Sequence, residues 1–492
     1  MPLNQLWRIE GVLKTLSPLH VGDGGTGVSS HSKDADVATV CQDAANRPYI
    51  PGSSLRGFLR DAFGRRFGTD SDEFRSLFGV QHERTGTGPA GALGGLLGVW
   101  DATLAAAAVP DPKLIQEAPH VVINRKTRTA HDGLLYFEQF VPAGTAFRVN
   151  LVIECAQSNA GEDVERLVGQ LLWLLEELRN DTARLGSNTA TGYGRVEWAE
   201  PKVSRLTKDS FTAWASGKGQ LIDCLQQERS IARLPPAAVA DAKRKTLRIP
   251  VVIRFSGPFL VNQPLDGKKK GEGPQKGAPE ANHEPATTPE GYCRLPGSSL
   301  HGSLRAQTER IARTIAGENA ERWVRDVSAP AGETATPAAV DCLWGTVGLR
   351  SPVRLSDFVA KERGEAVSQE FVAIDRFTGG GADRLKFTAR AFIKPELHGE
   401  MCIDLDMWRA LVERHARAGH PPPSVRPGSP AQGPDAWNEV WKLFVFCIRD
   451  WIEGDIRLGF GAAKGYGHCT VTLKDYASPR DLFQTIVQEL TV

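Results

Sequence analysis

The chain has 492 residues, of which 41% are hydrophobic, which is enough apolar content for two buried cores. Its formal net charge is only +1, so overall charge does not mark it as a nucleic-acid-binding protein, and any such binding must depend on local patches. No apolar run approaches the roughly 18 residues of a membrane span and no secretory signal pattern opens the chain, so we expect a soluble, cytoplasmic protein with no membrane contact.

The chain opens with a rough alternation of apolar and polar residues over 6–16, which predicts a half-buried strand. A glycine-rich turn then leads into a polar loop that contains Asp34 and Asp36. The loop ends at a second short strand candidate, 37–41. These two carboxylates are the first candidates for chemistry in the chain.

The next segment, 49–60, reads Tyr-Ile-Pro-Gly-Ser-Ser-Leu-Arg-Gly-Phe-Leu-Arg and predicts a tight turn that leads into a helix. Ser53 and Ser54 can cap this helix. Arg56 and Arg60 lie one helical turn apart, beside the positive end of the helix dipole. This helix start therefore predicts a site for an anion such as a phosphate.

The remainder of the first half predicts strands around a basic loop and then a helix. Residues 121–137 read as strand, loop and strand, and the loop contains Arg125 and Lys126. A further strand is expected at 145–154. Apolar residues recur at helical spacing over 164–178, which predicts an amphipathic helix.

A glycine-rich loop at 184–196 leads into the last strand of the first half. Its Gly192-Tyr193-Gly194 sequence has few side chains that could form a core, so the backbone can lie against a sugar-phosphate chain. No Gly-Lys-Ser/Thr sequence follows, so this loop does not indicate an ATP site.

The second half repeats these features in the same order, which indicates a tandem duplication. The repeated segments are 247–255, 294–305, 343–345, 374–387, 443–452 and 457–468. Of these, 374–387 aligns with 123–136, and 457–468 aligns with the first glycine loop. The corresponding candidate RNA contacts are Ser298, Ser299, His301, Arg305, Arg376, Lys464, Gly465, Tyr466 and Gly467.

These patterns predict an α+β protein with a first domain at 1–200, a linker at 201–246 and a second domain at 247–492. Within the linker, 221–232 is expected to be helical. Each domain carries a helix after an early strand and another before its last strand, which favours a β-α-β-β-α-β ferredoxin-like fold. The halves differ most at 264–291, a Gly/Pro/Lys-rich loop with Asp266 as its aspartate.

Four motifs in order resemble the RAMP superfamily of CRISPR type III systems. They are Leu-His-Val-Gly-Asp-Gly, Arg-Pro-Tyr-Ile-Pro-Gly-Ser-Ser-Leu-Arg-Gly, Ile-Asn-Arg-Lys-Thr and Gly-Tyr-Gly-Arg-Val. The chain resembles in particular the backbone subunits that line guide RNA in Csm, Cmr and related complexes. Two fused copies resemble the double backbone subunits of type III-D-like complexes.

The resemblance implies tandem ferredoxin-like (RRM-like) RAMP domains with loop and thumb insertions. It implies that the helix start and the glycine loop hold guide RNA, and that a hairpin thumb pushes between guide and target bases. The expected partners are CRISPR guide RNA, complementary target RNA, further backbone subunits and a large polymerase/nuclease-type subunit of an antiviral defense complex.

In catalytic relatives, an aspartate in the loop before the helix motif cleaves target RNA with a divalent metal. Carried over, that residue is most nearly Asp36, with Asp34 as the alternative and Asp266 as the candidate in the second half. The resemblance implies that Asp36 binds magnesium (Mg²⁺) or manganese (Mn²⁺). The 2′-hydroxyl of the RNA can then attack in line, as an endoribonuclease of this kind requires.

Two other functions fit the same residues. The chain could be a structural RNA-binding subunit whose aspartates do not react. It could also be a guide-processing endoribonuclease, whose activity would be independent of metal and would act on the precursor repeat.

Overall fold

The computed structural model describes most of the chain in two compact units. The described residues are 5–28, 36–79, 94–105, 114–124, 129–155, 163–180, 183–217, 219–228, 231–236, 246–263, 283–288, 290–317, 323–324, 338–346, 349–417, 437–476 and 478–491. The first unit comprises Met1–Thr189 and Tyr193–Arg244, and the second comprises Ala190–Gly192 and Lys245–Val492.

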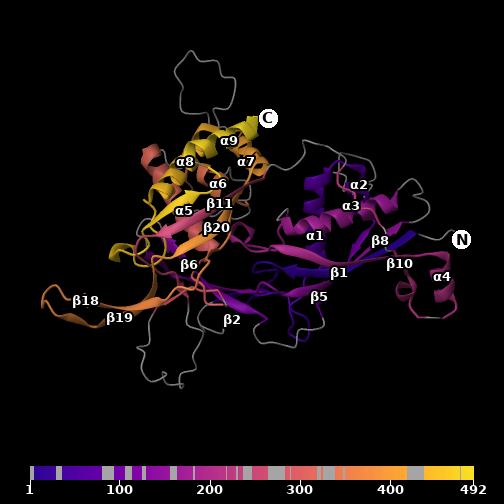
Figure 1. The fold of residues 1–492 in the computed structure, drawn as a ribbon, viewed down its shortest axis with the longest axis horizontal. Coiled ribbons are helices and arrows are strands. Elements are labelled where there is room, and N and C mark those ends of the chain that lie inside the picture. Colours follow the sequence, from indigo (N-terminus) through magenta and orange to yellow (C-terminus); the bar gives the residue numbers. More distant parts are fainter. Residues whose placement is uncertain are drawn as a thin grey trace, which may run out of the picture. The chain divides into compact units, whose positions relative to one another are not determined.

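The main sheet of the first unit has the strand order β10-β9-β1-β8-β4, and β5 also pairs with β8 (Figure 1). Its strands are β1 (Gln5–Thr15), β4 (Leu97–Val99), β5 (Thr103–Leu104), β8 (Ala146–Cys155), β9 (Val196–Arg205) and β10 (Gln226–Glu228). All of its ladders are antiparallel. Without β10, this is the strand order of a β-α-β-β-α-β unit, which confirms the predicted ferredoxin-like fold.

Helices α1 (Gly52–Phe67), α2 (Asp72–Phe78) and α3 (Val164–Glu177) cover one face of this sheet (Figure 1). The other helical segments are η2 (Leu178–Asn180), η3 (Thr189–Thr191), which begins at the last residue of this part of the unit, and α4 (Lys208–Ala215) and η4 (Leu221–Cys224), which follow β9. Strand β8 buries alternate side chains, such as Leu151 and Ile153, and α3 buries Leu171 and Leu174 against them. Burial of each such side chain contributes roughly 1.5–3 kcal/mol to folding.

A second sheet in this unit has the strand order β2-β3-β7-β6. Its strands are β2 (Gly22–Val28), β3 (Asp36–Val40), β6 (Gln116–Asn124) and β7 (Thr129–Phe140). Strands β6 and β7 form a long antiparallel hairpin, and β3 runs parallel to β7. The polar loop ahead of the helix motif therefore ends on a strand that lies beside the hairpin.

The second unit repeats the ferredoxin-like sheet with the order β15-β17-β20-β11-β21, and β16 also pairs with β20. Its strands are β11 (Thr246–Phe255), β15 (Arg294–Leu295), β16 (Val353–Leu355), β17 (Phe358–Ala360), β20 (Glu396–Asp404) and β21 (Cys469–Leu473). The first strand is again central, between the strand that precedes the late helix and the strand that follows it. The duplication read from the sequence is thus a duplication of the fold.

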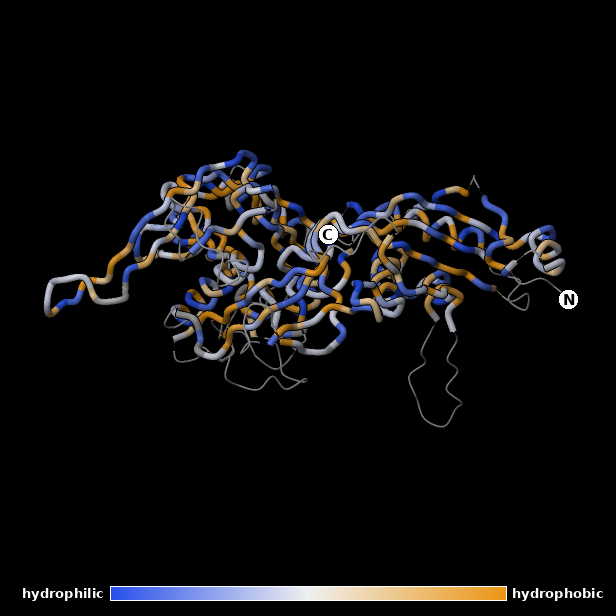
Figure 2. Tube along the Cα trace, turned by 90° about the horizontal axis from the view of Figure 1, so that it is seen from below, coloured by the Kyte–Doolittle hydropathy of each residue, from blue (hydrophilic) through white to orange (hydrophobic). Residues whose placement is uncertain are grey.

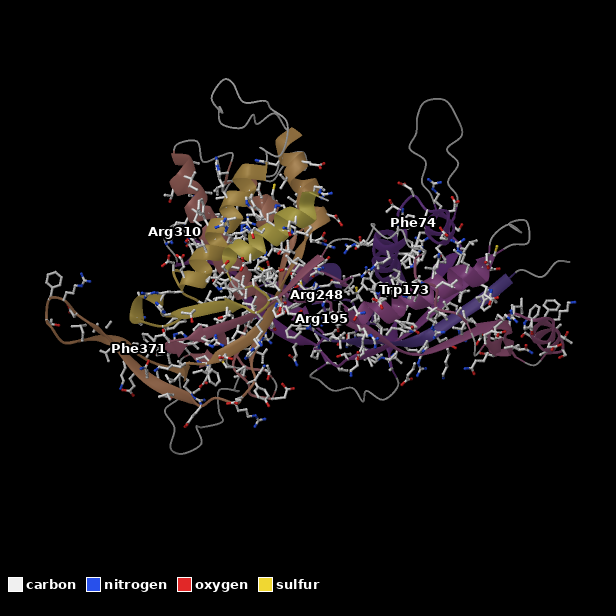
Figure 3. All side chains as sticks on the ribbon, turned by 45° about the horizontal axis from the view of Figure 1, so that its top comes forward. Phe74, Trp173, Arg195, Arg248, Arg310 and Phe371 are labelled. Atoms are coloured by element: carbon white, nitrogen blue, oxygen red, sulfur yellow. The ribbon has the colours of Figure 1, made fainter. Side chains whose placement is uncertain are left out.

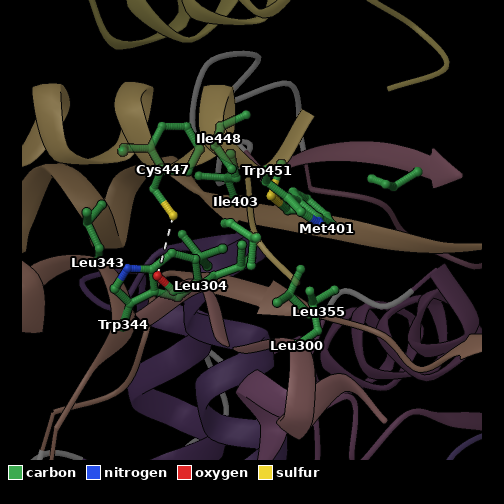
Figure 4. Close-up of a cluster of buried hydrophobic side chains, with 14 of the residues drawn as sticks. Leu300, Leu304, Leu343, Trp344, Leu355, Met401, Ile403, Cys447, Ile448 and Trp451 are labelled. Carbon is green, nitrogen blue, oxygen red and sulfur yellow. Dashed lines mark hydrogen bonds between the residues drawn. The ribbon is translucent and has the colours of Figure 1, made fainter. Parts of the chain in front are cut away.

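The helices of the second unit enclose a large apolar core. They are α5 (Gly297–Ala316), α6 (Ala339–Trp344), α7 (Leu405–Arg417), α8 (Trp437–Glu453), η6 (Ala462–Lys464) and α9 (Pro479–Thr491). Figure 4 shows Leu304 of α5 and Trp451 of α8 in this core, where the Cys447 thiol lies 3.4 Å from the Leu304 carbonyl oxygen.

A second hairpin extends away from this core (Figure 1). It is formed by β18 (Ala366–Ile374) and β19 (Gly381–Ile393), with β12 (Pro258–Phe259) at the end of β19. A short ladder joins β13 (Asn262–Gln263) to β14 (Glu284–Pro285). Hydrophilic and hydrophobic segments alternate along the hairpin (Figure 2).

The segment expected as a linker, 201–246, contributes regular structure to the first unit. Strand β9 continues to Arg205, and α4 and β10 follow. The prediction of a helix at 221–232 was wrong, because Leu221–Cys224 is a single 3-10 turn that leads into β10. Among the described residues, no helix is both long and apolar enough to cross a membrane.

Candidate nucleic-acid interface

The first helix motif starts α1 with an unexpected cap. Its N-cap is Pro51 rather than a serine, and the backbone N–H of Gly52 donates to the Asp101 carboxylate at 2.7 Å. The predicted capping by Ser53 and Ser54 was therefore wrong. Ser53 is exposed and Ser54 is half-buried, so both hydroxyls lie near the helix start without serving as its cap.

The second copy uses the same arrangement. Pro296 is the N-cap of α5, and the Gly297 N–H donates to Asp357 at 2.8 Å. Ser298 and Ser299 are half-buried. In both copies a carboxylate already supplies the negative charge that a helix N-terminus favours, so this first N–H is occupied before any phosphate arrives.

The two arginines of the first motif differ in their contacts. Arg56 donates to the carbonyl oxygens of Phe78 at 3.0 Å and Leu97 at 3.4 Å, so its guanidinium ties α1 to the end of α2 and to β4. Arg60 is exposed, and its guanidinium lies 5.2 Å from the ring centroid of Phe74. Arg60 is therefore more available than Arg56 for contact with a phosphate.

The equivalent residues of the second motif are turned inward. Arg305 donates to Glu309 at 3.1 Å, to Asp341 at 2.9 Å and to the Gly345 carbonyl oxygen. The His301 ring lies edge-on to Trp344, with centroids 5.2 Å apart. The structure thus gives Arg305 a role in packing that its sequence position did not suggest.

The first glycine loop folds back onto the turn that contains His20. The Gly194 N–H donates to the Pro18 carbonyl oxygen at 2.8 Å, and the Ser187 N–H donates to that of His20 at 3.0 Å. Gly192 and Gly194 have φ of 101° and 80°, and a Cβ at Gly194 would clash with a nearby carbonyl oxygen. Tyr193 is only 9% exposed, so little of its ring is open to a base.

The second glycine loop folds in the same way. Gly467 donates to the Pro258 carbonyl oxygen at 2.9 Å, and Gly465 and Gly467 have φ of 83° and 73°. Tyr466 is 2% exposed, and its hydroxyl donates to Gln369 of β18. Lys464, in contrast, is exposed. Positive φ therefore accounts for both glycines, together with close backbone packing at Gly467, and Lys464 is the side chain of the loop that could contact RNA.

The hairpins carry the remaining candidate contacts. Arg376 is exposed in the turn between β18 and β19, beside Phe377, which is 100% exposed. Arg125 and Lys126, in the corresponding part of the first hairpin, lie outside the described residues. An exposed ring and an exposed cation at a hairpin tip are suited to contact with nucleic-acid bases and phosphates.

Asp36 is the first residue of β3, where it is exposed and pairs with Val28 of β2. Asp34 and Asp266 lie outside the described residues. No group of three or more His, Cys, Asp or Glu that could hold a metal occurs in the described part of the chain. A single exposed carboxylate is still compatible with Mg²⁺, which is commonly bound by one or two carboxylates together with waters and phosphate oxygens.

A hydrogen-bonded carboxylate fixes the strand that carries Asp36. Asp23 of β2 accepts from the Thr39 hydroxyl at 2.6 Å and from the Gly25 N–H at 2.8 Å. These two bonds, that of Thr39 first, lower the pKa of the Asp23 carboxyl below its usual value. The β2–β3 pair is therefore held by an ionised side chain near neutral pH.

Sequence reasoning missed a buried polar cluster at the base of the first hairpin. Glu138 of β7 is 5% exposed and lies 3.3 Å from both the Nδ1 atom of His20 and the Nε2 atom of His120. Asn188 of the glycine loop donates to Glu138, and His120 stacks on Tyr136 with ring centroids 5.2 Å apart. The signal was a charged residue, Glu138, within the largely apolar Leu-Leu-Tyr-Phe-Glu-Gln-Phe run.

The cluster joins the turn that contains His20, the first hairpin and the first glycine loop. His20 Nδ1 lies 2.6 Å from the Gln139 carbonyl oxygen, which only accepts, so this nitrogen carries the proton. Burial, followed by the charge of Glu138, raises the pKa of the Tyr136 hydroxyl. Because β3 pairs with β7 at Ala38 and Glu138, Asp36 lies two residues along the strand from this cluster and on the same face of the sheet.

Comparison with known proteins agrees with the duplicated fold. The RAMP superfamily model matches residues 12–197 and 236–470, which together are most of the chain. The CRISPR system Cms endoribonuclease Csm3 of Mycobacterium tuberculosis (strain ATCC 25618 / H37Rv) is 29% identical over 219 residues. That stretch is 40% of this chain and 87% of the Mycobacterium protein.

Proposed function

Because the chain belongs to the RAMP superfamily, with a match in each half, we propose that it is a guide-RNA-binding backbone subunit of a type III CRISPR effector complex that cleaves complementary RNA. The similarity to a CRISPR endoribonuclease supports this assignment. Further backbone subunits and a large polymerase/nuclease-type subunit are the expected protein partners.

The observation that carries the proposal is the repeated combination of three elements. Each unit brings together a Pro-Gly-Ser-Ser helix start, a glycine loop that folds onto the first strand's turn, and a long hairpin. The exposed cations are Arg60 on the helix start of the first unit, and Lys464 on the glycine loop and Arg376 on the hairpin of the second unit. Exposed cations on such elements suit the phosphate charges of a nucleic-acid backbone.

We propose that Asp36 is the catalytic carboxylate of the first unit, with Asp34 as the alternative. Asp36 is exposed to solvent, and the Asp23–Thr39 bond holds its strand in place. Mg²⁺ or Mn²⁺ bound at this carboxylate would neutralise charge on the phosphoryl oxygens. The 2′-hydroxyl of the RNA attacks the adjacent phosphorus, and the 5′-oxygen leaves, which yields a cyclic phosphate and a 5′-hydroxyl end.

The test uses the complex assembled on its guide RNA and a labelled complementary RNA. Cuts at fixed positions are expected with Mg²⁺ and not with EDTA. Asp36→Ala should abolish the cuts assigned to the first unit while assembly is retained, and Asp72→Ala, which removes a carboxylate that is 98% exposed on α2, should not. If Asp36→Ala and Asp34→Ala complexes both cut normally, the catalytic assignment is wrong.

One observation favours a second function, guide processing without a metal. His20, His120 and Tyr136 lie around Glu138, and histidine and tyrosine are the groups that catalyse proton transfer in metal-independent RNA cleavage. Cleavage of precursor repeat RNA in EDTA would support it. A complex that binds guide RNA and cleaves neither substrate would instead be a structural subunit.

A further inference from the structure

The middle of the second hairpin carries a cluster of aromatic rings. Phe371 and Phe387 stack with centroids 5.0 Å apart, and Phe460 of the glycine loop lies edge-on to Phe387 at 6.4 Å. The Lys464 ammonium lies 5.2–5.6 Å from the three ring centroids. We call these four residues the aromatic platform; its phenylalanines are half-buried, its lysine is exposed, and Phe371 is labelled in Figure 3.

The platform occupies the place of the polar cluster in the first unit. Segment 374–387 aligns with 123–136, so Phe371 and Phe387 correspond to His120 and Tyr136. Each pair is directly opposed across its hairpin, and each is stacked, with interplanar angles of 18° and 17°. The stacked pair is therefore two phenylalanines in the second unit, and a histidine and a tyrosine, which can ionise, in the first.

The acidic centre of the cluster is also replaced. Glu138 corresponds to Ala389, which is fully buried. The carbonyl oxygen of Leu260 accepts from the glycine loop just as that of His20 does, and its side chain is apolar. The second unit therefore lacks, at these described positions, both the carboxylate and the imidazole of the first.

The strand beside the hairpin differs in the same sense. In the first unit Ala38 pairs in parallel with the Glu138 position, and in the second His283 pairs in parallel with the equivalent Ala389 position. Two residues before Ala38 the sequence has Asp36, whereas two residues before His283 it has Ala281. Counting back along the sequence from the paired residue therefore gives a carboxylate in the first copy and an alanine in the second.

We propose that the aromatic platform binds a nucleobase of single-stranded RNA, and that the second unit holds RNA at this position without cutting it. The inference rests on the proposed RNA-binding function. Partly exposed rings stack on any base, and a lysine beside them can pair with the phosphate of the stacked nucleotide. Burial, followed by the charge of Lys464, lowers the pKa of His283, so the imidazole beside Phe460 is neutral and adds a further ring surface.

Photocrosslinking tests the location in the unmodified full-length chain. Single-stranded RNA with 5-iodouridine at successive positions should crosslink to peptides that contain Phe371, Phe387 or Phe460. Crosslinks that fall only on other aromatic residues, such as Phe211 and Trp214 of α4, would overturn the proposal. This arm needs no variant and therefore does not depend on how substitutions affect folding.

Binding of 2-aminopurine RNA tests the energetics. Phe371→Leu combined with Phe387→Leu keeps apolar volume, and it should weaken binding by about tenfold or more and remove the fluorescence quenching that stacking produces. Phe371→Tyr should preserve both, and Phe211→Leu is the matched control for loss of a half-exposed ring. Unchanged affinity and quenching in the double variant, with a melting temperature like that of the wild type, would contradict the proposal.

The same preparations separate this inference from the proposed function. If the platform variants bind RNA normally and Asp36-dependent cleavage persists, the proposal that the platform binds a base is wrong and the proposed cleavage function stands. If an Asp34→Ala/Asp36→Ala complex still cuts complementary RNA at the second unit's position, the non-cutting part is wrong. If the wild-type complex binds no RNA, both fail.

Discussion

Asp101 accepts a hydrogen bond from the backbone N–H of Gly52 at 2.7 Å, although the two residues are 49 positions apart. Asp357 and Gly297, 60 positions apart, are joined in the same way. Each aspartate follows an edge strand and reaches the first residue of the helix that crosses the sheet. Duplication has therefore preserved a carboxylate cap that is distant in sequence, along with the Pro-Gly turn that it serves.

Removal of this cap should destabilise the first unit. We expect Asp101→Ala to lower the free energy of unfolding by about 1 kcal/mol, because the helix loses an acceptor and a favourable charge at its N-terminus. Asp101→Asn keeps an acceptor oxygen and should recover much of the loss. Thermal unfolding measures both, and Asp70→Ala, at an exposed turn, controls for loss of charge. A melting curve of Asp101→Ala that matches the wild type would refute the cap.

Arg60 and Arg305 occupy the same position of the two motifs. Substitution of Arg305 should mainly lower stability, and substitution of Arg60 should mainly weaken RNA binding. Arg305 faces Glu309 and Asp341, whose side chains are 5% and 1% exposed, so Arg305→Ala removes the cation beside two buried carboxylates. A loss of about 3 kcal/mol of stability is expected. Arg60→Ala removes an exposed stacked cation and should cost less than about 1 kcal/mol.

RNA affinity should be reduced more by Arg60→Ala than by Arg305→Ala. If Arg60 contacts a phosphate, Arg60→Ala reduces the slope of log K against log salt by about 1, uniformly across RNA sequences. Filter binding at several salt concentrations gives this slope, and denaturant titration gives the stability. An Arg305→Ala protein that unfolds like the wild type but loses RNA affinity would reverse the assignment.

The regular elements could be predicted because each has a local pattern. Alternate burial along β8 and the apolar face of α3 follow directly from residue periodicity, and the repeated order of elements then defines two ferredoxin-like cores. Helices α7 and α9, which the sequence reasoning did not anticipate, cover the core of the second unit.

The side-chain partners could not be predicted, because they come from distant positions. Arg305 has the spacing of a phosphate ligand in sequence, yet its carboxylate partner Asp341 is 36 residues further on. Tyr466 looks like an exposed loop aromatic, yet the loop closes over it against β18. The partners of Glu138 come from three other segments, namely the His20 turn, β6 and the first glycine loop. A comparison of the two repeats would have drawn attention to Asp101 and Asp357, since both follow an edge strand.

The Asp23–Thr39 bond should make the β2–β3 pair sensitive to acid. A carboxyl whose pKa is lowered in the folded state adds stability above its unfolded pKa of about 3.9 and loses it as pH falls through the folded pKa. Thr39→Val removes the largest cause of the shift. We expect a small loss in melting temperature at pH 7 that shrinks as the pH falls below the unfolded pKa and through the lowered folded pKa, whereas Thr39→Ser should behave like the wild type. A loss of equal size at neutral and at acid pH would show that the carboxylate is not involved.

Glu138 should act as a positioning residue that holds the first glycine loop against the hairpin. Glu138→Ala removes the acceptor for Asn188 and the partner of His20, so the loop should open more often. Losing a buried acceptor costs about 1–3 kcal/mol, which corresponds to roughly 5- to 150-fold faster amide exchange where opening is local. The Ser187 amide, which donates to the His20 carbonyl oxygen, reports on this directly by hydrogen exchange.

The second unit provides an internal control for this measurement. The Phe460 amide makes the equivalent bond to Leu260, but Ala389 stands in place of the glutamate, so its exchange should be the same in the variant and the wild type. Glu138→Gln retains acceptor and donor atoms and should give intermediate exchange at Ser187. If Glu138→Ala speeds exchange equally at Ser187 and Phe460, the effect is global destabilisation. If it changes neither amide, the cluster does not hold the loop, and the glycine backbone contacts alone define its conformation.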